Sequence, residues 1–565
     1  MERKVNWVIN KDVNNAEALK LSKELNIDFI IAEMLVKRGI RTFDQSKQFF
    51  RPDPKYLHNP FLMKDMVMAV DRILLAINSQ ERIMIYGDYD VDGITSVALL
   101  SNFLEGLGCI VSRYIPDRSE GYGLSTNAIE MAYNQNQSLI IALDCGIKAI
   151  DQSKFAIKKG VDLIICDHHV PGNKLPSALA ILNPKREDCN YPFKELCGCG
   201  IGFKLIQAIN ERIGNDINTI SQFYELVAIA CAADIVPLVG ENRVLTFLGL
   251  NQLNMNPRLG LQLLLDQRDK RKIKINDLLF YIAPRINATG RLANASIALS
   301  LLTLNNKYDL RKIVKRVEEL NTKRKDIEKS MTNEALEQIR KSDTHNNYSN
   351  VVFKKNWHKG VVGIVASRII DRYYKPTIVF CKSNSGKLTG SGRSIKGVNL
   401  LKILSNCEKY IKKYGGHKYA VGLQIDEKDL EKFIEKFDIE CGKFVDYDLP
   451  YREISLECEI CFESINPKFI RILNQFQPFG PSNQAPIFLS KNVEITGMVQ
   501  NVGKNNEHVK INVMQNTKKI FSAIGFNLSE KMNELDTSNF DIVYSIEENI
   551  WNGKKTIQLN IKDLK

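Results

Sequence analysis

Residues 82–237 alternate short β-rich runs with helical patterns, and this alternation constrains the fold more than any other feature of the chain. The run LIIALD ends at Asp144 and the run VDLIICD ends at Asp167, while residues 146–159 between them have the pattern of a helix. This rhythm is typical of a doubly wound α/β domain built on a parallel sheet. We therefore predict such a domain for this part of the chain.

Acidic side chains follow the strand-like runs of this predicted domain directly. They are Asp88, Asp90, Asp92, Asp144 and Asp167. Ligands of parallel sheets bind beyond the carboxyl ends of the strands, so the pattern brings these carboxylates to one sheet edge. Carboxylates this close repel one another unless a cation lies between them. The sequence therefore predicts a cation site at this edge.

Calcium is the first candidate, because YGDYDVDG copies the spacing at the start of an EF-hand loop. Position twelve of such a loop should be a bidentate Glu, but counting from Asp88 it is Leu99. An EF-hand loop also follows a helix, whereas the preceding RIMIY has strand character. A calcium loop is therefore excluded.

The adjacent histidines of CDHHVPG, His168 and His169, stand just past a strand end at the same predicted edge. Aspartates combined with imidazoles form a hard site of oxygen and nitrogen ligands, which suits Mn²⁺ or Mg²⁺ better than zinc. One divalent ion does not balance four or five carboxylates, whereas two ions do. Two ions about 4 Å apart are the usual apparatus for hydrolysing phosphate esters, so we expect a two-metal hydrolytic site.

Each of these residues also has a purely structural interpretation. An aspartate after a strand often caps the next helix, which taken singly is the commoner role for Asp144 or Asp167. A histidine pair is more often hydrogen-bonded within a loop, and Asp234 in ACAADIVP can simply end a buried helix. The metal hypothesis depends on all of these residues meeting at one edge.

The composition is that of a globular protein, with 78 Lys and Arg against 65 Asp and Glu, a net charge of +13. This excess favours a polyanionic partner, although many basic proteins bind no nucleic acid. The first residues, MERKVNWVIN, lack a long apolar core, and no apolar run is long enough to cross a bilayer. We expect a cytosolic protein that does not bind membranes, with its 12 scattered cysteines as reduced thiols.

The rest of the chain divides into further units. An apolar stripe from Leu310 to Ile339 predicts a helix that spans roughly 45 Å and suits a connector between lobes. After it, a second α/β unit begins at VVF, and alternating strands such as HVKINVM and KTIQLNI predict a small β-barrel of the oligonucleotide-binding (OB) type. An Asn-Gly turn at Asn552 and Gly553 marks a hairpin there.

Five domains are expected from this reading. They are a helical N-terminal segment (1–76), an α/β catalytic domain (77–240), a helical region with the connector helix (241–345), a second α/β domain (346–446) and an OB-type barrel (447–565).

The motifs GDYDVDG, ALDCG, CDHH and AADIVP stand in the order and form of the four motifs of the DHH phosphoesterase superfamily. Two further motifs, APRINATGRL at 283–292 and YGGHKYAVG at 414–422, resemble those of the RecJ single-stranded-DNA exonucleases in particular. The resemblance covers about residues 82–565. It implies a DHH parallel-sheet lobe, a long helix, a DHH-associated α/β lobe and a C-terminal OB-type barrel.

The resemblance also implies roles at the metal site. The metal ligands would be Asp90, Asp92, Asp144, His168 and Asp234. Asp144 would bridge two Mn²⁺ or Mg²⁺ ions, Asp88 and His169 would complete or orient the ligand shell, and Asp167 would support it. His417 would lie near the scissile phosphate and stabilise developing charge, and a neutral structural histidine is the competing interpretation. The catalytic set is then Asp90, Asp92, Asp144, His168 and His417.

A strand-binding set is implied in the same way. Arg118, Ser391 and Arg393 would surround a 5′ phosphate, Arg285, Asn287 and Arg291 would contact the DNA strand, and His358, Gly415 and Gly416 would lie near the scissile phosphate. Without the resemblance, LTGSGRSIKG equally fits a surface turn, and Arg285 and Arg291 equally fit ion pairs. Trp551 and the lysines of the OB-type region suit single-strand binding without base preference, or an ordinary lysine-rich face.

We therefore interpret the chain as a metal-dependent exonuclease that degrades single-stranded DNA from the 5′ end to mononucleotides. The resemblance implies a monomer of the bacterial cytosol in DNA repair and recombination, with single-strand-binding protein and a RecQ-type helicase as partners. One alternative is a DHH phosphodiesterase for short oligonucleotides or cyclic dinucleotides, which the additional C-terminal OB-type domain disfavours. The other is a non-catalytic replication scaffold, which the intact acidic set disfavours.

Overall fold

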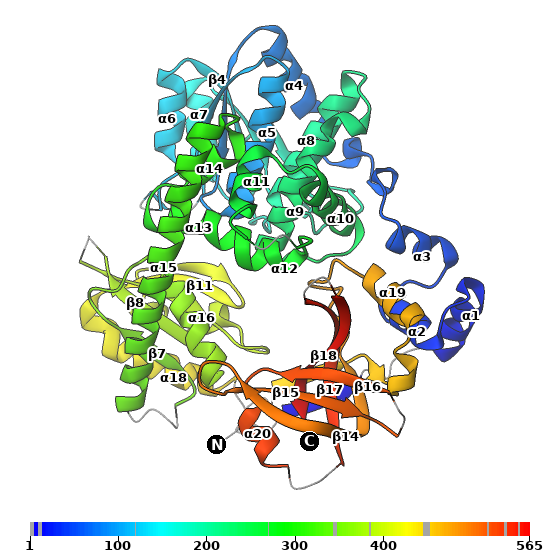
Figure 1. Ribbon diagram of the computed structural model, residues 1–565. Helices are drawn as coiled ribbons and strands as arrows, with labels where there is room; N and C mark the ends of the chain where they lie inside the picture. The colour runs from blue at the N-terminus through cyan, green and yellow to red at the C-terminus, as the bar shows by residue number, and fades with distance from the viewer. Residues whose placement is uncertain are drawn as a thin grey trace.

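The computed structural model describes residues 5–9, 14–118, 120–121, 123–268, 271–342, 347–383, 386–444, 452–516, 519–535, 539–551 and 554–565, without the side chains of Arg452, Ile550, Trp551 and Lys554. Figure 1 shows two α/β lobes joined by a long helix, with a β-barrel and a group of N-terminal helices beside them. Among the described helices, none combines the length and apolar character that a bilayer-spanning segment needs.

The first lobe contains a five-stranded sheet in the order β3-β2-β4-β5-β6, in which all neighbours are parallel. Its strands are β2 (Arg82–Gly87), β3 (Ile110–Tyr114), β4 (Gln137–Leu143), β5 (Asp162–Cys166) and β6 (Ala180–Leu182). The strands are continuous apolar runs because both faces of the sheet are covered. The predicted doubly wound parallel sheet is confirmed.

Helices cover the two faces of this sheet, and alternate strand residues point to each. Ile83 and Ile85 face a core with α4 (Met66–Asn78), α5 (Val91–Gly106) and α8 (Gly198–Arg212). Met84 and Tyr86 face a second core with α6 (Thr126–Asn134) and α7 (Ile150–Lys159).

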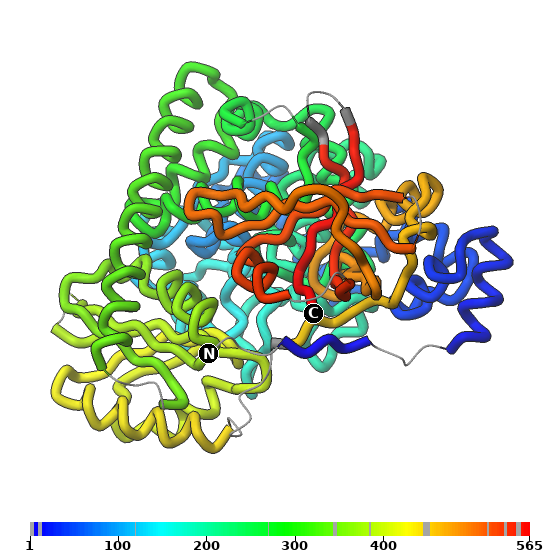
Figure 2. Tube along the Cα trace, turned by 60° about the horizontal axis from the view of Figure 1, so that its bottom comes forward, coloured from blue at the N-terminus to red at the C-terminus, as the bar shows by residue number. Residues whose placement is uncertain are grey.

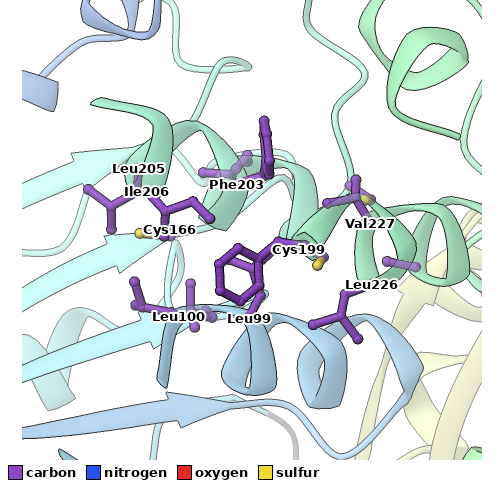
Figure 3. Packing of buried hydrophobic residues seen from close by; sticks show 14 of the residues in the cluster. Leu99, Leu100, Cys166, Cys199, Phe203, Leu205, Ile206, Leu226 and Val227 are labelled. Carbon is purple, nitrogen blue, oxygen red and sulfur yellow. The ribbon is translucent and has the colours of Figure 1, made fainter. Parts of the chain in front are cut away.

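The first of these cores is closely packed where α5, α8 and α9 (Tyr224–Ala233) meet (Figure 3). Leu99 of α5, Phe203 of α8 and Leu226 of α9 are fully buried there. The thiols of Cys166 and Cys199 lie in the same core, and all twelve cysteines are free, in agreement with the prediction of reduced thiols.

A helical region follows and ends in the connector helix. It comprises α10 (Gly240–Met255), α11 (Leu259–Leu265), α12 (Ile275–Asp277), η4 (Leu278–Ile282), α13 (Ala283–Leu292), α14 (Ser296–Thr303) and α15 (Lys307–Lys341). The predicted stripe of α15 contacts two different cores. Leu310 and Val317 pack against α11 and α14, and Met331 and Ile339 pack against the second lobe. The predicted connector helix is confirmed.

The second lobe has a mixed five-stranded sheet in the order β10-β11-β9-β8-β7, in which only β7 and β8 are parallel. Its strands are β7 (Asn350–Phe353), β8 (Thr377–Lys382), β9 (Leu388–Arg393), β10 (Lys413–His417) and β11 (Ala420–Ile425), and its helices are α16 (Val362–Tyr373), α17 (Leu400–Ser405) and α18 (Leu430–Gly442). A second α/β lobe was expected here.

The C-terminal barrel closes through pairing of its first strand with β17. Its strands are β14 (Phe488–Val502), β15 (His508–Met514), β16 (Ile520–Gly525), β18 (Lys554–Leu564) and β17 (Asn539–Trp551), with α20 (Ser529–Asn533) between β16 and β17 and the short β13 (Cys458–Glu459) added beside β14. This closed five-stranded barrel has the predicted OB type. The predicted hairpin pairs β17 with β18, while Asn552 and Gly553 lie outside the described residues.

The predicted N-terminal segment is shared between two cores. Strand β1 (Val5–Ile9) pairs in parallel with β12 (Arg452–Leu456), as Figure 2 shows near the C-terminus. The helices α1 (Asn15–Leu25), α2 (Phe29–Lys37) and α3 (Phe43–Phe50) pack with α19 (Pro467–Gln475) and the barrel. Leu57, Met63 and α4 belong to the core of the first lobe. The segment predicted as helical therefore begins with a strand and contributes to different cores.

One buried arginine of α10 joins these modules to the first lobe. The guanidinium of Arg243 donates to the carbonyls of Phe49 (3.0 Å), Gln475 (3.2 Å), Phe476 (2.9 Å), Gln477 (3.1 Å) and Pro478 (3.4 Å). It also lies 3.8 Å above the Phe49 ring. Burial, and next the positive charge of Arg38, lower the pKa of Arg243 to about 9. The position of the barrel relative to the lobe therefore depends on this contact.

We expect Arg243→Ala to loosen this junction, because the buried carbonyls of residues 475–478 would lose their donor. Hydrogen exchange of residues 43–50 and 475–478 should be at least about a hundredfold faster, corresponding to roughly 3 kcal/mol of lost local stability. Arg316→Ala is the control, since the Arg316–Glu319 pair is more than half exposed on the arginine side (56%). Unchanged exchange in Arg243→Ala would contradict the assigned role.

Candidate metal centre and nucleic-acid interface

Three neighbouring strands deliver the acidic residues of the first lobe. Asp88 follows β2, Asp144 follows β4 and Asp167 follows β5, and since these strands are parallel their carboxyl ends share one edge. Asp90 caps α5 by accepting the Gly93 N–H at 3.2 Å. The edge predicted from the sequence is therefore the edge at which the structure gathers these side chains.

The seven residues predicted as metal ligands form one cluster. Their ligand atoms fall into three groups in which all atoms lie within 4.8 Å of one another. The groups are Asp88, Asp90 and Asp144; Asp92, His168 and Asp234; and Asp144, His168 and His169. Asp144 and His168 each occur in two groups, so the three groups are parts of one continuous set of ligand atoms.

His168 lies at the centre of this cluster. Its Nε2 atom is 3.2 Å from Asp144 Oδ1, 3.7 Å from Asp234 Oδ2 and 3.9 Å from Asp92 Oδ2. Both His168 Nε2 and Asp88 Oδ1 are buried and make no hydrogen bond to the described residues. Buried polar atoms are nearly always paired, so these two atoms fit a site that binds a cation.

The backbone at Asp144 is strained. Its φ is +60°, in the left-handed region that an aspartate rarely occupies, while its N–H donates to the Cys166 carbonyl at 2.9 Å. A Cβ at position 198 would lie 2.6 Å from Asp144 Cβ, so Gly198 is required for this approach. Strain of this kind persists at functional sites when the surroundings hold it in place.

Asp92 is held by the start of α8. It is 2% exposed and accepts the N–H groups of Gly198 and Cys199, each at 2.7 Å. Free N–H groups at a helix N-terminus favour a negative charge. The helix thus fixes the direction in which this carboxylate points.

Asp167 contacts His169 through both its backbone and its ring. It accepts the Ile147 N–H at 2.9 Å and the His169 N–H at 3.1 Å, and its Oδ1 lies 2.8 Å from His169 Nδ1. Burial opposes ionisation of Asp167, but the hydrogen bond from His169 lowers its pKa overall. This contact turns Nε2 of His169 toward the cluster, the arrangement of ligand-supporting carboxylates in metal sites.

Burial and mutual repulsion shift the pKa values of the cluster. Burial, and then the Asp90 charge, raise the pKa of Asp88 to about 8 and that of Asp234 to about 7. Burial raises the pKa values of Asp92 and Asp144 as well. Burial, and then His169, lower the pKa of His168 to about 3, so its imidazole is neutral. Neutral imidazole and crowded carboxyls are the donor set that a divalent cation binds with release of protons.

The second lobe brings His417 to the same place. The His417 ring, at the end of β10, lies nearly parallel to the His169 ring with centroids 6.1 Å apart. Burial, and then the His169 charge, lower the pKa of His417, so the ring is neutral near pH 7. Gly415 and Gly416 precede it on β10 beside the same site.

Three arginines, Arg118, Arg291 and Arg393, lie close enough together for their charges to interact. Arg118 donates to the Gly290 carbonyl (2.9 Å) and stacks on Tyr89, with its guanidinium 4.1 Å from the ring centroid. Burial, and then the charges of Arg118 and Arg393, lower the pKa of Arg291 to about 10. Within the described chain, none of these three arginines forms an ion pair with a carboxylate. Arg118 acts on Asp88, and Arg291 on Asp90, only through charge at longer range. Their guanidinium groups therefore keep donors that match an anionic ligand.

Arg393 and Ser391 lie beside these arginines on β9. Arg393 donates to Ser391 Oγ at 3.2 Å. A Cβ at Gly363 would be 3.0 Å from both Ser391 Oγ and Arg393 Nη2, so the start of α16 approaches the pair closely. Arg291 reaches this lobe as well, donating to the Gly360 carbonyl at 2.8 Å. Arg118, Arg291 and Arg393, with Ser391 beside them, are called the arginine group below. Its members come from both lobes and from the helical region between them.

Not every predicted strand-binding residue joins this group. Arg285 donates to Glu318 at 2.6 Å and stacks on Tyr281, so the structure places it in the ion pair that was its alternative interpretation. Asn287 lies on α13 with its Oδ1 buried and without a partner in the described chain. His358 accepts the Gly360 N–H at 3.1 Å. The Trp551 side chain lies outside the described residues.

Sequence reasoning missed two contributors. Tyr89, inside the first motif, provides the ring beneath Arg118. Gly198, in the run CGCG, makes room for Asp144 and donates to Asp92. No local signal in CGCG indicates that role.

Models of known domains match the three folded units. The DHH family N-terminal domain matches residues 82–231, the DHHA1 domain matches residues 346–443 and the RecJ OB domain matches residues 456–563. Together with the metal-binding edge, these matches define the protein as a DHH-type phosphoesterase.

Relatives are similar over most of the chain. The single-stranded-DNA-specific exonuclease RecJ of Bacillus subtilis is 36% identical, over 99% of this chain and 71% of its own length, and RecJ of Escherichia coli is 31% identical, over 88% and 89%. The crystal structure of RecJ from Thermus thermophilus in complex with Mn²⁺ superposes with a TM-score of 0.86 at 27% identity, over 100% of this chain and 80% of that chain. The chain therefore belongs to the RecJ family, and it is a nuclease of the hydrolase class.

We expect the stability of the metal-free protein to fall as the pH rises. The folded-state pKa of Asp88, about 8, lies above its ordinary value of 3.8, so the stabilisation of its protonated form is complete below that ordinary value and is lost as pH rises through about 8. Melting temperatures measured from pH 6 to 9 should therefore decline, and saturating Mn²⁺ should remove the decline because the cation replaces the protons.

Asp88→Asn should flatten this decline, whereas Asp151→Asn on the exposed surface of α7 should leave it intact. A decline that persists equally in saturating Mn²⁺ would contradict the proposed competition between protons and cations.

Proposed function

We propose that the protein is a single-stranded-DNA-specific exonuclease that hydrolyses its substrate from the 5′ end and uses two Mn²⁺ or Mg²⁺ ions. The observation that supports this most directly is the pairing of two opposite sites. A carboxylate and imidazole cluster lies on one lobe, and an arginine group with members from both lobes lies near enough for the charges of Arg291 and Asp90 to interact. A phosphodiester with a charged end can occupy both sites at once.

The residues present fit two cations with shared ligands. Asp88, Asp90 and Asp144 would hold one ion, and Asp92, His168 and Asp234 the other, with Asp144 bridging and His169 completing the shell. Bound divalent ions supply a water of lowered pKa and neutralise charge on a phosphate. Solved structures of RecJ from Thermus thermophilus are described as complexes with Mn²⁺ and with Mg²⁺.

The arginine group would bind the terminal phosphate and so set the direction of digestion. Arg118, Arg291 and Arg393 supply fixed donors without competing carboxylates, and Ser391 Oγ adds a hydroxyl within 3.2 Å of Arg393. Charge-assisted hydrogen bonds from arginine match the geometry of a phosphate. The distance from this group to the metal centre would then fix the number of nucleotides removed in each cycle.

The reaction would release one nucleotide in each cycle. Hydrolysis adds a water oxygen to the phosphorus between the first and second nucleotides, and the 3′ oxygen of the first nucleotide leaves with a proton. The products are a nucleoside 5′-monophosphate and a shortened strand with a new 5′ phosphate. His417, neutral near pH 7, would donate from its ring to the developing charge on that phosphate.

The remaining assignments extend this proposal. Residues 77–240 would hold the ions, residues 346–446 most of the phosphate pocket and residues 447–565 the strand behind the cleaved end, while residues 1–76 and 241–345 would fix these units relative to one another. A cytosolic monomer acting with single-strand-binding protein and a RecQ-type helicase in repair and recombination is the cellular role that we propose with it.

End-labelled single-stranded and double-stranded DNA with Mn²⁺ test the activity. Asp144→Asn should lower kcat by about a thousandfold or more, because it removes the bridging charge. Asparagine tolerates the left-handed backbone at this position, so the fold should persist. Asp151→Asn is the control. Binding of single-stranded DNA by the wild type without cleavage would instead support the scaffold, and cleavage confined to short oligonucleotides would support a phosphodiesterase.

Removal of one arginine should change the preference for the strand end. Wild type should digest a 5′-phosphorylated strand about tenfold or more faster than a 5′-hydroxyl strand at low substrate concentration, and Arg393→Gln should lose that preference. Arg372→Gln, at the exposed C-terminal end of α16 in the same lobe, is the matched control. An undiminished preference in Arg393→Gln would place the terminal phosphate elsewhere.

A further inference from the structure

Ile235, the residue that follows the predicted metal ligand Asp234, has a strained backbone. Its φ is +58°, in the left-handed region. Twelve non-glycine residues of the described chain have a positive φ, and most of them are asparagine or aspartate, which tolerate that region. Ile235 is the only β-branched residue among these twelve, and a β-branched side chain makes this conformation a true outlier.

Contacts on both sides of Ile235 hold the backbone in this conformation. Before it, the Asp234 N–H donates to the Ala230 carbonyl at 2.9 Å and extends the hydrogen bonding of α9. After it, the Leu238 N–H donates to the Pro481 carbonyl at 2.8 Å. Pro481 lies in the segment between α19 and the first long strand of the barrel, β14. A few residues therefore connect the metal centre to the junction with the barrel.

Burial of the Ile235 side chain offsets little of this strain. The residue is 61% exposed, whereas the following Val236 is buried in the first-lobe core. Of the three carboxylates around His168, Asp234 is the most exposed, with a side-chain exposure of 33% against 2% and 4% for the other two. Asp234 and Ile235 thus lie on the open side of the cluster, from which a substrate can reach it.

The combination of strain and exposure distinguishes Ile235 from other surface residues. A single exposed isoleucine is ordinary on a protein surface. A strained one is not, because asparagine or glycine would occupy the same backbone conformation at lower free energy. Strain of this kind clusters at sites that bind ligands. The isoleucine side chain is therefore the part of this turn that needs a functional explanation.

We propose that Ile235 packs against the base of the second nucleotide, which lies on the 3′ side of the cleaved bond. The inference rests on the proposed function, in which the strand continues from the metal centre toward the barrel. Residues 234–238 connect these two places, so the strand passes the Ile235 side chain directly after the metal centre. An aliphatic group contacts the flat face that all four bases share, so the contact holds the second nucleotide without base preference.

Ile235→Asn separates this role from a structural one. Asparagine tolerates the left-handed conformation, so the melting temperature should rise or stay within about 2 °C of the wild-type value. The KM for 5′-phosphorylated single-stranded DNA should nevertheless rise about tenfold, since burial of one exposed aliphatic side chain contributes on that scale. Ile235→Val keeps an apolar β-branched side chain and should retain a KM within about twofold of the wild-type value.

Ile157→Asn is the matched control. Ile157 is 62% exposed near the end of α7, so it has the same exposure as Ile235 on an ordinary helix. Its substitution should leave the KM unchanged. A rise in KM for Ile235→Asn that is matched by a large fall in melting temperature would assign Ile235 a structural role and overturn the proposal.

A strand with an abasic second nucleotide gives a readout that needs no variant to fold. Wild type should have a KM about tenfold higher for this strand than for the intact one, whereas Ile235→Asn should treat the two strands alike. A strand with its abasic position at the fifth nucleotide is the control for the substrate. Equal KM values of wild type for the intact strand and the strand lacking the second base would overturn the proposal.

Failure of the proposed function is recognised separately, as absence of single-strand digestion by the wild type. Binding without turnover then tests the contact itself. The dissociation constant of a 5′-phosphorylated strand should be about tenfold higher for the double variant Asp144→Asn/Ile235→Asn than for Asp144→Asn alone. Equal dissociation constants would show that the strand does not contact Ile235.

Discussion

Repulsion among carboxylates at one edge of a parallel sheet is the constraint on which the rest of this structure depends. The order β3-β2-β4-β5 makes the ends of β2, β4 and β5 neighbours, so the acidic residues that follow these strands lie close together. Burial removes the water that would screen them and raises the pKa of Asp88 to about 8. N–H groups at the start of α8 offset part of the free-energy cost of burying these carboxylates. Bound cations would offset the rest.

The arginine group carries the charge opposite to that of the acidic sheet edge. Arg291 lies on α13 of the helical region and donates to the Gly360 carbonyl of the second lobe. Arg393 of β9 lies near enough for its charge to lower the pKa of Arg291. Neither group of charges is stable alone, because like charges crowd in both. In the proposed function, a phosphodiester chain with one phosphate among the arginines and the next at the cations would satisfy both groups. Helix α15 packs into the cores on both sides of the connection between the lobes.

Sequence patterns predicted what is local and missed what is not. Strand-like runs and the acidic residues after them predict the parallel sheet and its acidic edge, and helical periodicity predicts the apolar stripe of α15. Both patterns occur within short stretches of sequence. The pairing of β1 with β12 joins five-residue strands more than 400 positions apart, and no local pattern indicates it. Arg285 and Arg291 share one motif, but their spacing points them to different sides of α13, and only the structure shows that Arg285 meets Glu318.

The glycines of YGGHKYAVG show why geometry adds information that motif matching lacks. A motif treats its glycines alike, but Gly416 is needed for a backbone turn, whereas Gly415 and Gly422 leave space. A nuclease that digests any sequence must recognise features that all nucleotides share, which are the phosphates and the flat faces of the bases. In the proposed function, arginine donors for the phosphates would meet part of that requirement, because phosphates carry none of the hydrogen-bonding edges that distinguish one base from another.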